Sequence, residues 1–207
     1  MKIFAVIIVL FWTLGCTNLS QVSNPSILPS PSCSVPVFSV GDNWHWKMRG
    51  NDRIWLLKRV TAVEGDAYII EREMNGDIGP TVEKVDKKAL KMIYLKPAGR
   101  PGWKLNTPFI IKFPLFVGKK WAMAPGNTVL LYGLFGTGSA PLDVQVMSFE
   151  DVETPAGKFK AFRMDCKVGI EWFVSFWYAP DVRNIIRVEP ERDSVFELIS
   201  YSAKDLL

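Results

Sequence analysis

Lys158–Val168 reads KFKAFRMDCKV and alternates between apolar and polar residues over its length. Its later apolar positions share one face of an extended chain: Phe162, Met164, Cys166 and Val168. The polar positions between them share the other face: Arg163, Asp165 and Lys167. A period of two predicts a β-strand with one face in the core and the other in water.

Runs with similar patterns lie on both sides of this strand and are separated by turn residues. They predict strands over these ranges: Asn43–Arg49, Ile54–Val63, Ala67–Glu73, Thr128–Phe135, Leu142–Phe149, Ile170–Tyr178, Asn184–Val188 and Ser194–Tyr201. Thr154–Gly157 (TPAG) has the composition of a tight turn. Val85–Leu95 fits a helix and a strand about equally. We therefore expect a single antiparallel all-β domain with little helix, built as a strongly curved sheet or a partly closed barrel.

The N-terminus has the layout of a bacterial lipoprotein signal. Lys2 precedes ten apolar residues, and Gly15 stands directly before Cys16, the expected lipid attachment site. The apolar run is shorter than the roughly 20 residues that cross a bilayer. Residues 17–36 are rich in Ser and Pro and carry no charge, which favours an extended tether. We predict a signal peptide over residues 1–15, an anchor and tether over 16–37, and the β domain over 38–207.

The signal departs from the usual lipoprotein pattern in one respect. Thr13 and Leu14 stand where an aliphatic residue and then a small residue are usual, as if the pattern had moved by one position. Ordinary cleavage and an uncleaved anchor are the alternatives. Acylation with palmitate-type chains would place the protein in the bacterial cell envelope. Thr17 after Cys16 resembles lipoproteins sent to the outer membrane, facing the periplasm.

Composition excludes some classes of protein. The chain is 48% apolar and 22% charged, as in globular domains, and its net charge of +4 is spread out. No basic cluster indicates a nucleic-acid partner. In an oxidising compartment Cys33 and Cys166 could form a disulfide. The alternative, which we favour, is that Cys166 is a small buried apolar residue of its strand.

The sequence offers little for catalysis. His45 is the single histidine, so metal sites with several histidines are excluded, and we expect no metal, no cofactor and no enzymatic activity. Glu150, Asp151 and Glu153 are neighbouring carboxylates beside a predicted turn. A hydrolase would need two carboxylates that face each other across a cleft.

Large apolar side chains are plentiful, and a curved sheet could use them to hold an apolar ligand. The candidate ligand face consists of Trp103, Phe113, Trp121, Trp172 and Trp177. Packing in the core explains the same residues and is the reading we prefer. The leading hypothesis is a membrane-anchored envelope lipoprotein that binds a lipid, another apolar ligand or an envelope protein. The alternatives are a carboxylate-dependent hydrolase of envelope material and a structural subunit of an envelope assembly.

Four motifs occur in a fixed order along the domain: GDxW from Gly41, FPLxxGKxW from Phe113, TPAGxFxAF from Thr154 and WYAP from Trp177. With this order and spacing the chain resembles a group of uncharacterised exported bacterial β domains, many of them lipoproteins. The resemblance implies an antiparallel, barrel-like fold and an envelope location. It implies no activity.

Overall fold

The computed structural model describes residues 31–123, 141–168, 172–190 and 194–203. Within these ranges the chain forms strands and turns, and all strand pairs are antiparallel. One 12-stranded sheet has the order β7-β6-β5-β4-β3-β2-β14-β13-β12-β11-β10-β9. The all-β antiparallel prediction is therefore confirmed. None of the described residues belongs to a helix that could cross a membrane.

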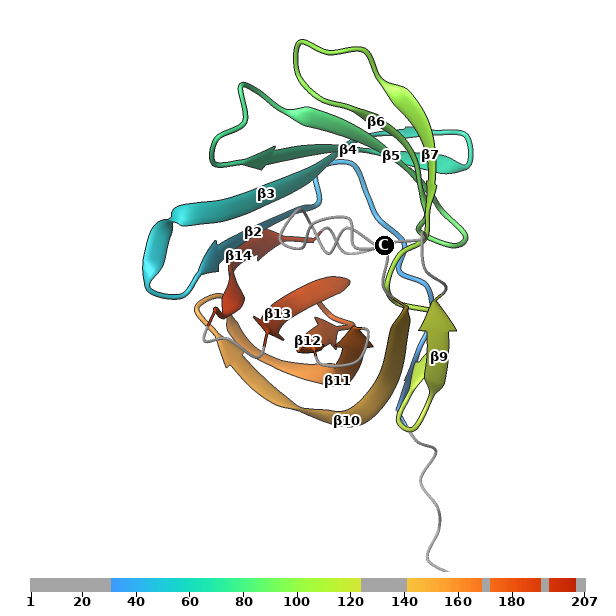
Figure 1. Ribbon diagram of the computed structural model, residues 1–207, viewed down its shortest axis with the longest axis vertical. Coiled ribbons are helices and arrows are strands. Elements are labelled where there is room, and N and C mark those ends of the chain that lie inside the picture. The colour runs from blue at the N-terminus through green and yellow to red at the C-terminus, as the bar shows by residue number, and fades with distance from the viewer. Residues whose placement is uncertain (1–30, 124–140, 169–171, 191–193, 204–207) are drawn as a thin grey trace, which may run out of the picture.

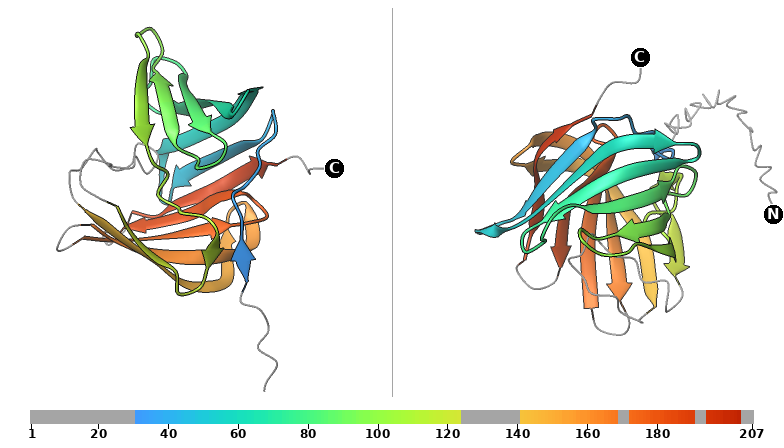
Figure 2. Two further views of the ribbon diagram at one scale, coloured as in Figure 1. Left: turned by 90° about the vertical axis from the view of Figure 1, so that its right-hand side faces the viewer. Right: turned by 90° about the horizontal axis from the view of Figure 1, so that it is seen from above.

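The first half of the sheet follows the chain from one strand to the next. Its strands are β2 (Asn43–Met48), β3 (Asn51–Glu64), β4 (Ala67–Met74), β5 (Thr81–Asp86), β6 (Met92–Lys96) and β7 (Trp103–Thr107). The second half is formed by β9 (Lys120–Met123), β10 (Leu142–Thr154), β11 (Gly157–Val168), β12 (Trp172–Ala179), β13 (Asn184–Pro190) and β14 (Phe196–Ser202). The two halves lie one above the other and are joined where β14 pairs with β2 (Figures 1 and 2).

A separate two-stranded pair lies outside this sheet. It consists of β1 (Ser32–Cys33) and β8 (Leu115–Phe116). Among the described residues the large sheet is open, because β7 and β9 are its two edge strands and do not pair with each other. Closure into a barrel and strong curvature are not confirmed.

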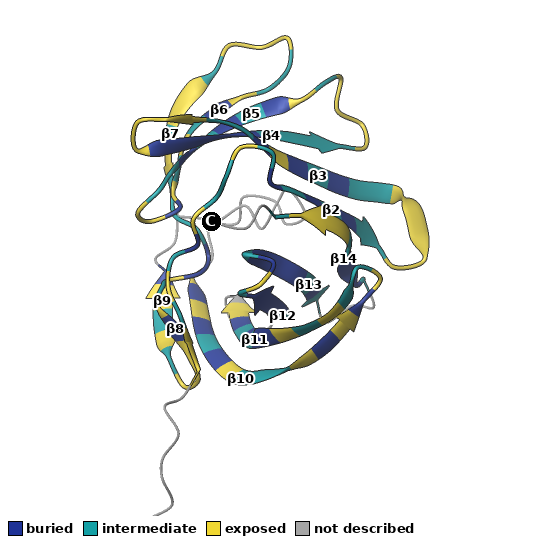
Figure 3. Cartoon of the chain, turned by 180° about the vertical axis from the view of Figure 1, so that it is seen from behind, coloured by how far each residue is buried: buried dark blue, intermediate teal, exposed yellow. Residues whose placement is uncertain are grey.

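The strand predicted over Lys158–Val168 is β11. Phe162, Met164 and Cys166 are at most 1% exposed, so their shared face is in the core as expected. The side chain of Val168 lies outside the described residues. Buried and exposed positions alternate in the same way along β3 and β10 (Figure 3). Alternation is thus a sound guide for the long strands of this sheet.

The region Val85–Leu95 contains no helix, so the helical alternative is wrong. β5 ends at Asp86, a turn follows, and β6 begins at Met92. The Asp86 carboxylate accepts hydrogen bonds from the amides of Lys88 and Ala89, which holds this turn. The strand alternative is confirmed from Met92 onward, since β6 contains Met92 and Tyr94. Leu90 lies in the turn before β6, buried and with a positive φ of 52°. The strand predicted over Thr128–Phe135 lies outside the described residues.

Two tryptophans of β2 tie the halves of the sheet together. Trp44 and Trp46 are 1% and 4% exposed. The Nε1 atom of Trp44 donates to the carbonyl oxygen of Val182 at 2.9 Å, and that of Trp46 donates to the carbonyl oxygen of Ile185 at 2.8 Å. Each side chain therefore fills the core and satisfies a polar group near the start of β13.

The GDxW motif positions the same junction. Gly41 has a φ of 98°, which favours glycine, and its amide donates to the carbonyl oxygen of Val60. Asp42 is fully buried and accepts a hydrogen bond from the amide of Ser39 at 2.8 Å. It also forms an ion pair with Arg183, in the turn between β12 and β13, at 3.3 Å. The motif is therefore architectural and links the first strand to a distant turn.

Candidate functional site

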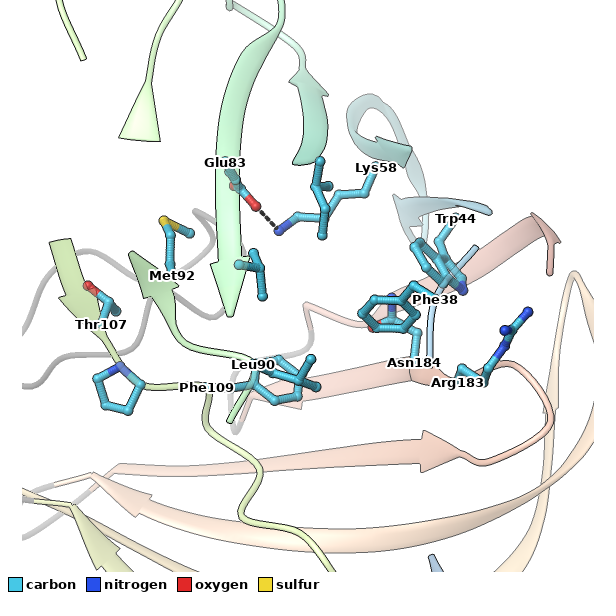
Figure 4. A pocket seen from close by; sticks show the side chains of 13 residues that line it. Phe38, Trp44, Lys58, Glu83, Leu90, Met92, Thr107, Phe109, Arg183 and Asn184 are labelled. Carbon is cyan, nitrogen blue, oxygen red and sulfur yellow. Dashed lines mark hydrogen bonds and ion pairs between the residues drawn. The ribbon is translucent and has the colours of Figure 1, made fainter. Parts of the chain in front are cut away.

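A cavity of about 70 Å³ lies where the two halves of the sheet meet (Figure 4). We call it the central cavity. Its apolar lining is Phe38, Trp44, Ile70, Val85, Leu90, Met92, Pro108 and Phe109. Its polar lining is Lys58, Glu83, Thr107, Arg183 and Asn184. The space is large enough for several water molecules and smaller than the 300–1,000 Å³ of sites for drug-sized ligands.

An ion pair is buried in the wall of the central cavity. Nζ of Lys58 lies 2.7 Å from Oε2 of Glu83, and their exposed fractions are 7% and 1%. Antiparallel register explains the meeting: Lys58 in β3 is opposite Arg72 in β4, while Glu83 in β5 is opposite Ile70 in β4. Glu83 thus stands at an inward position of its strand, where Thr81 and Val85 are also buried.

The hydrogen bonds of Glu83 are incomplete. Its Oε1 atom is buried and accepts no hydrogen bond from the described residues. Nε of Arg72 lies 3.7 Å away, which is an ion-pair distance but too long for a hydrogen bond. Burial lowers the pKa of Lys58, and the opposing attraction of Glu83 does not restore it. Burial of the pair therefore costs desolvation free energy, and Oε1 of Glu83 could still accept a hydrogen bond.

The side of the cavity near β13 is polar and firmly held. Arg183 donates to the carbonyl oxygen of Val37 at 2.6 Å and pairs with Asp42. Its φ of 60° places it in the left-handed region, within the turn before β13. Asn184 is buried beside it, and its Oδ1 accepts from the amide of Ile185 at 2.8 Å. The central cavity thus has apolar walls and two polar regions (Figure 4).

A second concave region, the outer groove, lies on the opposite face of the second half. It is open to solvent and has a volume of about 550 Å³. Trp177 lines this groove. The guanidinium groups of Arg163 and Arg187 lie 5.6 and 5.0 Å from the centre of its ring. Arg163 pairs with Asp165 and Arg187 pairs with Glu189. Nε of Arg187 is nevertheless buried and has no hydrogen-bond partner among the described residues. The central cavity is the more enclosed of the two regions.

Glu150 lies beside the outer groove, where it contacts Trp177. The Nε1 atom of Trp177 donates to Oε1 of Glu150 at 2.8 Å, and Ser148 donates to Oε2. Burial acts to raise the pKa of Glu150, but these hydrogen bonds and the charge of Arg163 outweigh it and lower the pKa. A general acid in glycoside hydrolysis needs the opposite shift.

The structure does not bring the five predicted face residues together. Trp103 is 46% exposed on the edge strand β7. Phe113 packs against Tyr178, with 5.4 Å between the ring centres. Trp121 is half-buried and donates to the carbonyl oxygen of Ile110 at 3.1 Å. Trp177 lies in the outer groove.

The side chain of Trp172 and the whole of Cys16 lie outside the described residues. Cys33 and Cys166 are both free thiols, in β1 and β11. Burial raises the pKa of Cys33, and it raises the pKa of Cys166 to about 12. Both thiols are therefore protonated near neutral pH and are weak nucleophiles. The burial of Cys166 agrees with its reading as a small apolar residue, and the disulfide stays a prediction.

Sequence reasoning missed the residues that shape the central cavity, above all Glu83, Lys58 and Arg183. A usable signal existed for Glu83, which shares one strand face with Thr81 and Val85. His45 lies on the outer face of β2 against Trp55, at 6.0 Å between ring centres, as its alternation predicts. Within the described residues no group of three or more His, Cys, Asp or Glu side chains could hold a metal ion.

No protein-family model matches this sequence, and no curated protein is similar to it. A provisionally assigned lipoprotein from Parabacteroides distasonis is 14% identical with a TM-score of 0.39. A provisionally assigned exported protein with a YmcC-like fold from Bacteroides fragilis is 15% identical with a TM-score of 0.44. Both alignments cover 82% of this chain and 99% of the other. TM-scores below 0.5 are too low to transfer a property to this chain.

Proposed function

We propose that this chain is a lipid-anchored protein of the bacterial cell envelope, held at the outer membrane and facing the periplasm. The support comes from the N-terminal sequence. Lys2 and an apolar run form an export signal, Gly15 and Cys16 form the acylation point, and an uncharged Ser- and Pro-rich tether follows. Acyl chains on Cys16 would give stable anchoring.

Cys16→Ala is expected to abolish acylation. Cells that express the wild-type chain should incorporate labelled palmitate into it, and cells that express the variant should incorporate none. Cys33→Ala is the matched control and should be labelled like the wild type. Equal labelling of wild type and Cys16→Ala would contradict the proposed anchor.

We further propose that the β domain binds a small amphipathic ligand in the central cavity. The observation that carries this proposal is the buried Lys58–Glu83 pair, in which Oε1 of Glu83 accepts no hydrogen bond from the described residues. A ligand hydroxyl or ammonium group would supply that donor, and a short apolar part would fill the space beside Leu90 and Phe109. The volume of the cavity favours a ligand of few atoms over a complete acyl chain.

The hydrolase alternative has less support. Glu83 is the one carboxylate among the described residues that line the central cavity, whereas glycoside hydrolysis uses two facing carboxylates. Beside Trp177 the pKa of Glu150 is lowered, which suits a permanently ionised group. Binding therefore accounts for the observed side chains more completely than catalysis does.

Filling the central cavity is expected to prevent ligand retention. Met92 lines the cavity and is half-buried, so Met92→Phe would occupy part of its volume. Met74→Phe, a half-buried methionine outside the lining, is the matched control. Native mass spectrometry after gentle extraction should find a bound small molecule on the wild type and on Met74→Phe, but not on Met92→Phe. A wild-type chain that is always empty would contradict the proposal.

A further inference from the structure

The turn between β8 and β9 presents apolar side chains to solvent. Phe116 and Val117 are 42% and 38% exposed. They occupy the first two positions of a turn in which the amide of Lys119 donates to the carbonyl oxygen of Phe116. Gly118, at the third position, has the positive φ of 89° that a type II turn requires. Polar residues are usual at such a position, so two exposed apolar residues here call for an explanation.

This turn is held in place by Lys119 and by the backbone of Gly118. Nζ of Lys119 donates to the carbonyl oxygens of Lys112 and Pro114. The amide of Gly118 donates to the carbonyl oxygen of Val146 at 2.9 Å, which fixes the turn to β10. The exposure of Phe116 and Val117 is therefore a property of a well-bonded turn.

The surroundings of the turn are positively charged. Lys112 and Lys120 are exposed, and Lys119 lies over the ring of Phe116 at 5.8 Å. None of these three lysines forms an ion pair with a carboxylate of the described residues. Partial burial lowers the pKa of Lys119, and the charge of Lys112 lowers it further. An anionic surface would relieve this repulsion.

The turn also lies beside the point where the tether meets the domain. Ser32 of β1 is opposite Phe116, and Cys33 is opposite Leu115 (Figures 1 and 2). At about 3.1 Å per residue, the chain from Cys16 to Ser32 spans at most about 50 Å. An anchor on Cys16 would therefore keep this turn within about 50 Å of the membrane, and this step rests on the proposed function.

We infer that the β8–β9 turn is a membrane-docking element that binds the anionic lipid surface. Phe116 and Val117 insert among the headgroups, while Lys112 and Lys120 pair with lipid phosphates. Apolar insertion and lysine attraction are the two contributions that hold peripheral elements on anionic bilayers. Docking would fix the orientation of the β domain relative to the membrane.

The test uses the complete chain, purified from membranes and reconstituted into two kinds of vesicle. One contains only phosphatidylcholine, and the other contains one-third phosphatidylglycerol. Amine acylation followed by mass spectrometry reports the access of reagent to each lysine. Lys112 and Lys120 should react about fivefold more slowly on the anionic vesicles, as expected for a lysine held near such a surface. Lys88, exposed in the β5–β6 turn, is the internal reference and should not change.

Substitutions in the turn distinguish insertion of its apolar side chains from a general attraction between the protein and the charged vesicles. Phe116→Ser combined with Val117→Ser should remove the protection of both lysines, because the apolar contribution is lost. Ile78→Ser is the matched control, since Ile78 is 86% exposed in the β4–β5 turn, and it should keep the protection. Equal reaction rates on both kinds of vesicle, or full protection in the double variant, would overturn the inference.

Flotation with the phosphatidylcholine vesicles at high salt tests the anchor separately. A chain that floats there but shows no protection on anionic vesicles supports the anchor and overturns docking by the turn. A chain that does not float there but is protected on anionic vesicles overturns the anchor and supports docking. The two proposals therefore fail in different ways.

Discussion

Glu83→Leu is expected to lower the free energy of unfolding by about 3–5 kcal/mol, because it leaves the Lys58 ammonium buried without its carboxylate partner. Both side chains are almost completely buried, so solvent screening offers little relief. Urea denaturation at pH 7, followed by tryptophan fluorescence, measures the loss. A loss below about 1 kcal/mol would contradict this account of the pair.

The double variant Lys58→Met with Glu83→Leu is the control. It removes both charges and fills a similar volume, so its stability should lie within about 1 kcal/mol of the wild type or exceed it. It should also lose the bound small molecule, since the polar group that recognises it has gone. If the double variant were as unstable as Glu83→Leu alone, the loss of stability would come from altered packing and not from the unpaired Lys58 charge.

The loss of unfolding free energy caused by Glu83→Leu, called the deficit below, should depend on pH. Burial already lowers the pKa of Lys58 below its ordinary value of 10.5, and removal of Glu83 lowers it further. Between that lowered pKa and 10.5, the unfolded chain binds more protons than the folded chain. Stability of the variant therefore rises with pH in this window and levels off above it. A deficit that grows with pH would contradict the assignment to Lys58.

Trp46→Ala is the second substitution with a large expected effect, a loss of about 3–5 kcal/mol. Trp46 is 4% exposed, and its Nε1 atom donates to the carbonyl oxygen of buried Ile185 at 2.8 Å. The substitution leaves a cavity and removes the donor of that carbonyl. Urea denaturation again provides the measurement.

Two control variants separate the contributions of the hydrogen bond and of core burial to the effect of Trp46→Ala. Trp46→Phe keeps most of the apolar area and should cost about 1–2 kcal/mol, chiefly through the lost hydrogen bond. Trp55→Ala removes a tryptophan from the outer face of β3, where it is partly exposed, and should cost about 1 kcal/mol. If Trp46→Ala cost no more than Trp55→Ala, the core position of Trp46 would not matter for stability.

The sequence was sufficient for β2, β3, β10 and β11, because their inner and outer residues alternate. β4 was also predicted, although its first four residues are all buried. β2, β3, β4, β10 and β11 all begin within three residues of the expected positions. Short strands such as β7 and β9 were missed, since four or five residues with mixed burial carry no clear period. Which strands form the open edges of the sheet depends on how the strands pair. The alternation of residues within one strand does not show which strand is its neighbour.

The central cavity could not be predicted for a related reason. Lys58 and Glu83 lie in different strands and meet only through the register of β4 between them. Charged residues are usually exposed, so a reading of the sequence places both in water. Trp177 was taken as part of an apolar face. Its ring contacts two arginines on the outer side of the sheet, and it is only 7% exposed.

The pairing of β2 with β14 has a consequence for the order in which the protein can fold. β2 is the first strand of the large sheet to leave the ribosome or a translocation channel, and β14 is the last. Until β14 arrives, one edge of β2 has no partner, and the incomplete sheet exposes an edge that invites aggregation. Contacts between such distant segments also slow folding. Export in an unfolded state, with assembly after the last strand has crossed, would avoid this exposed intermediate.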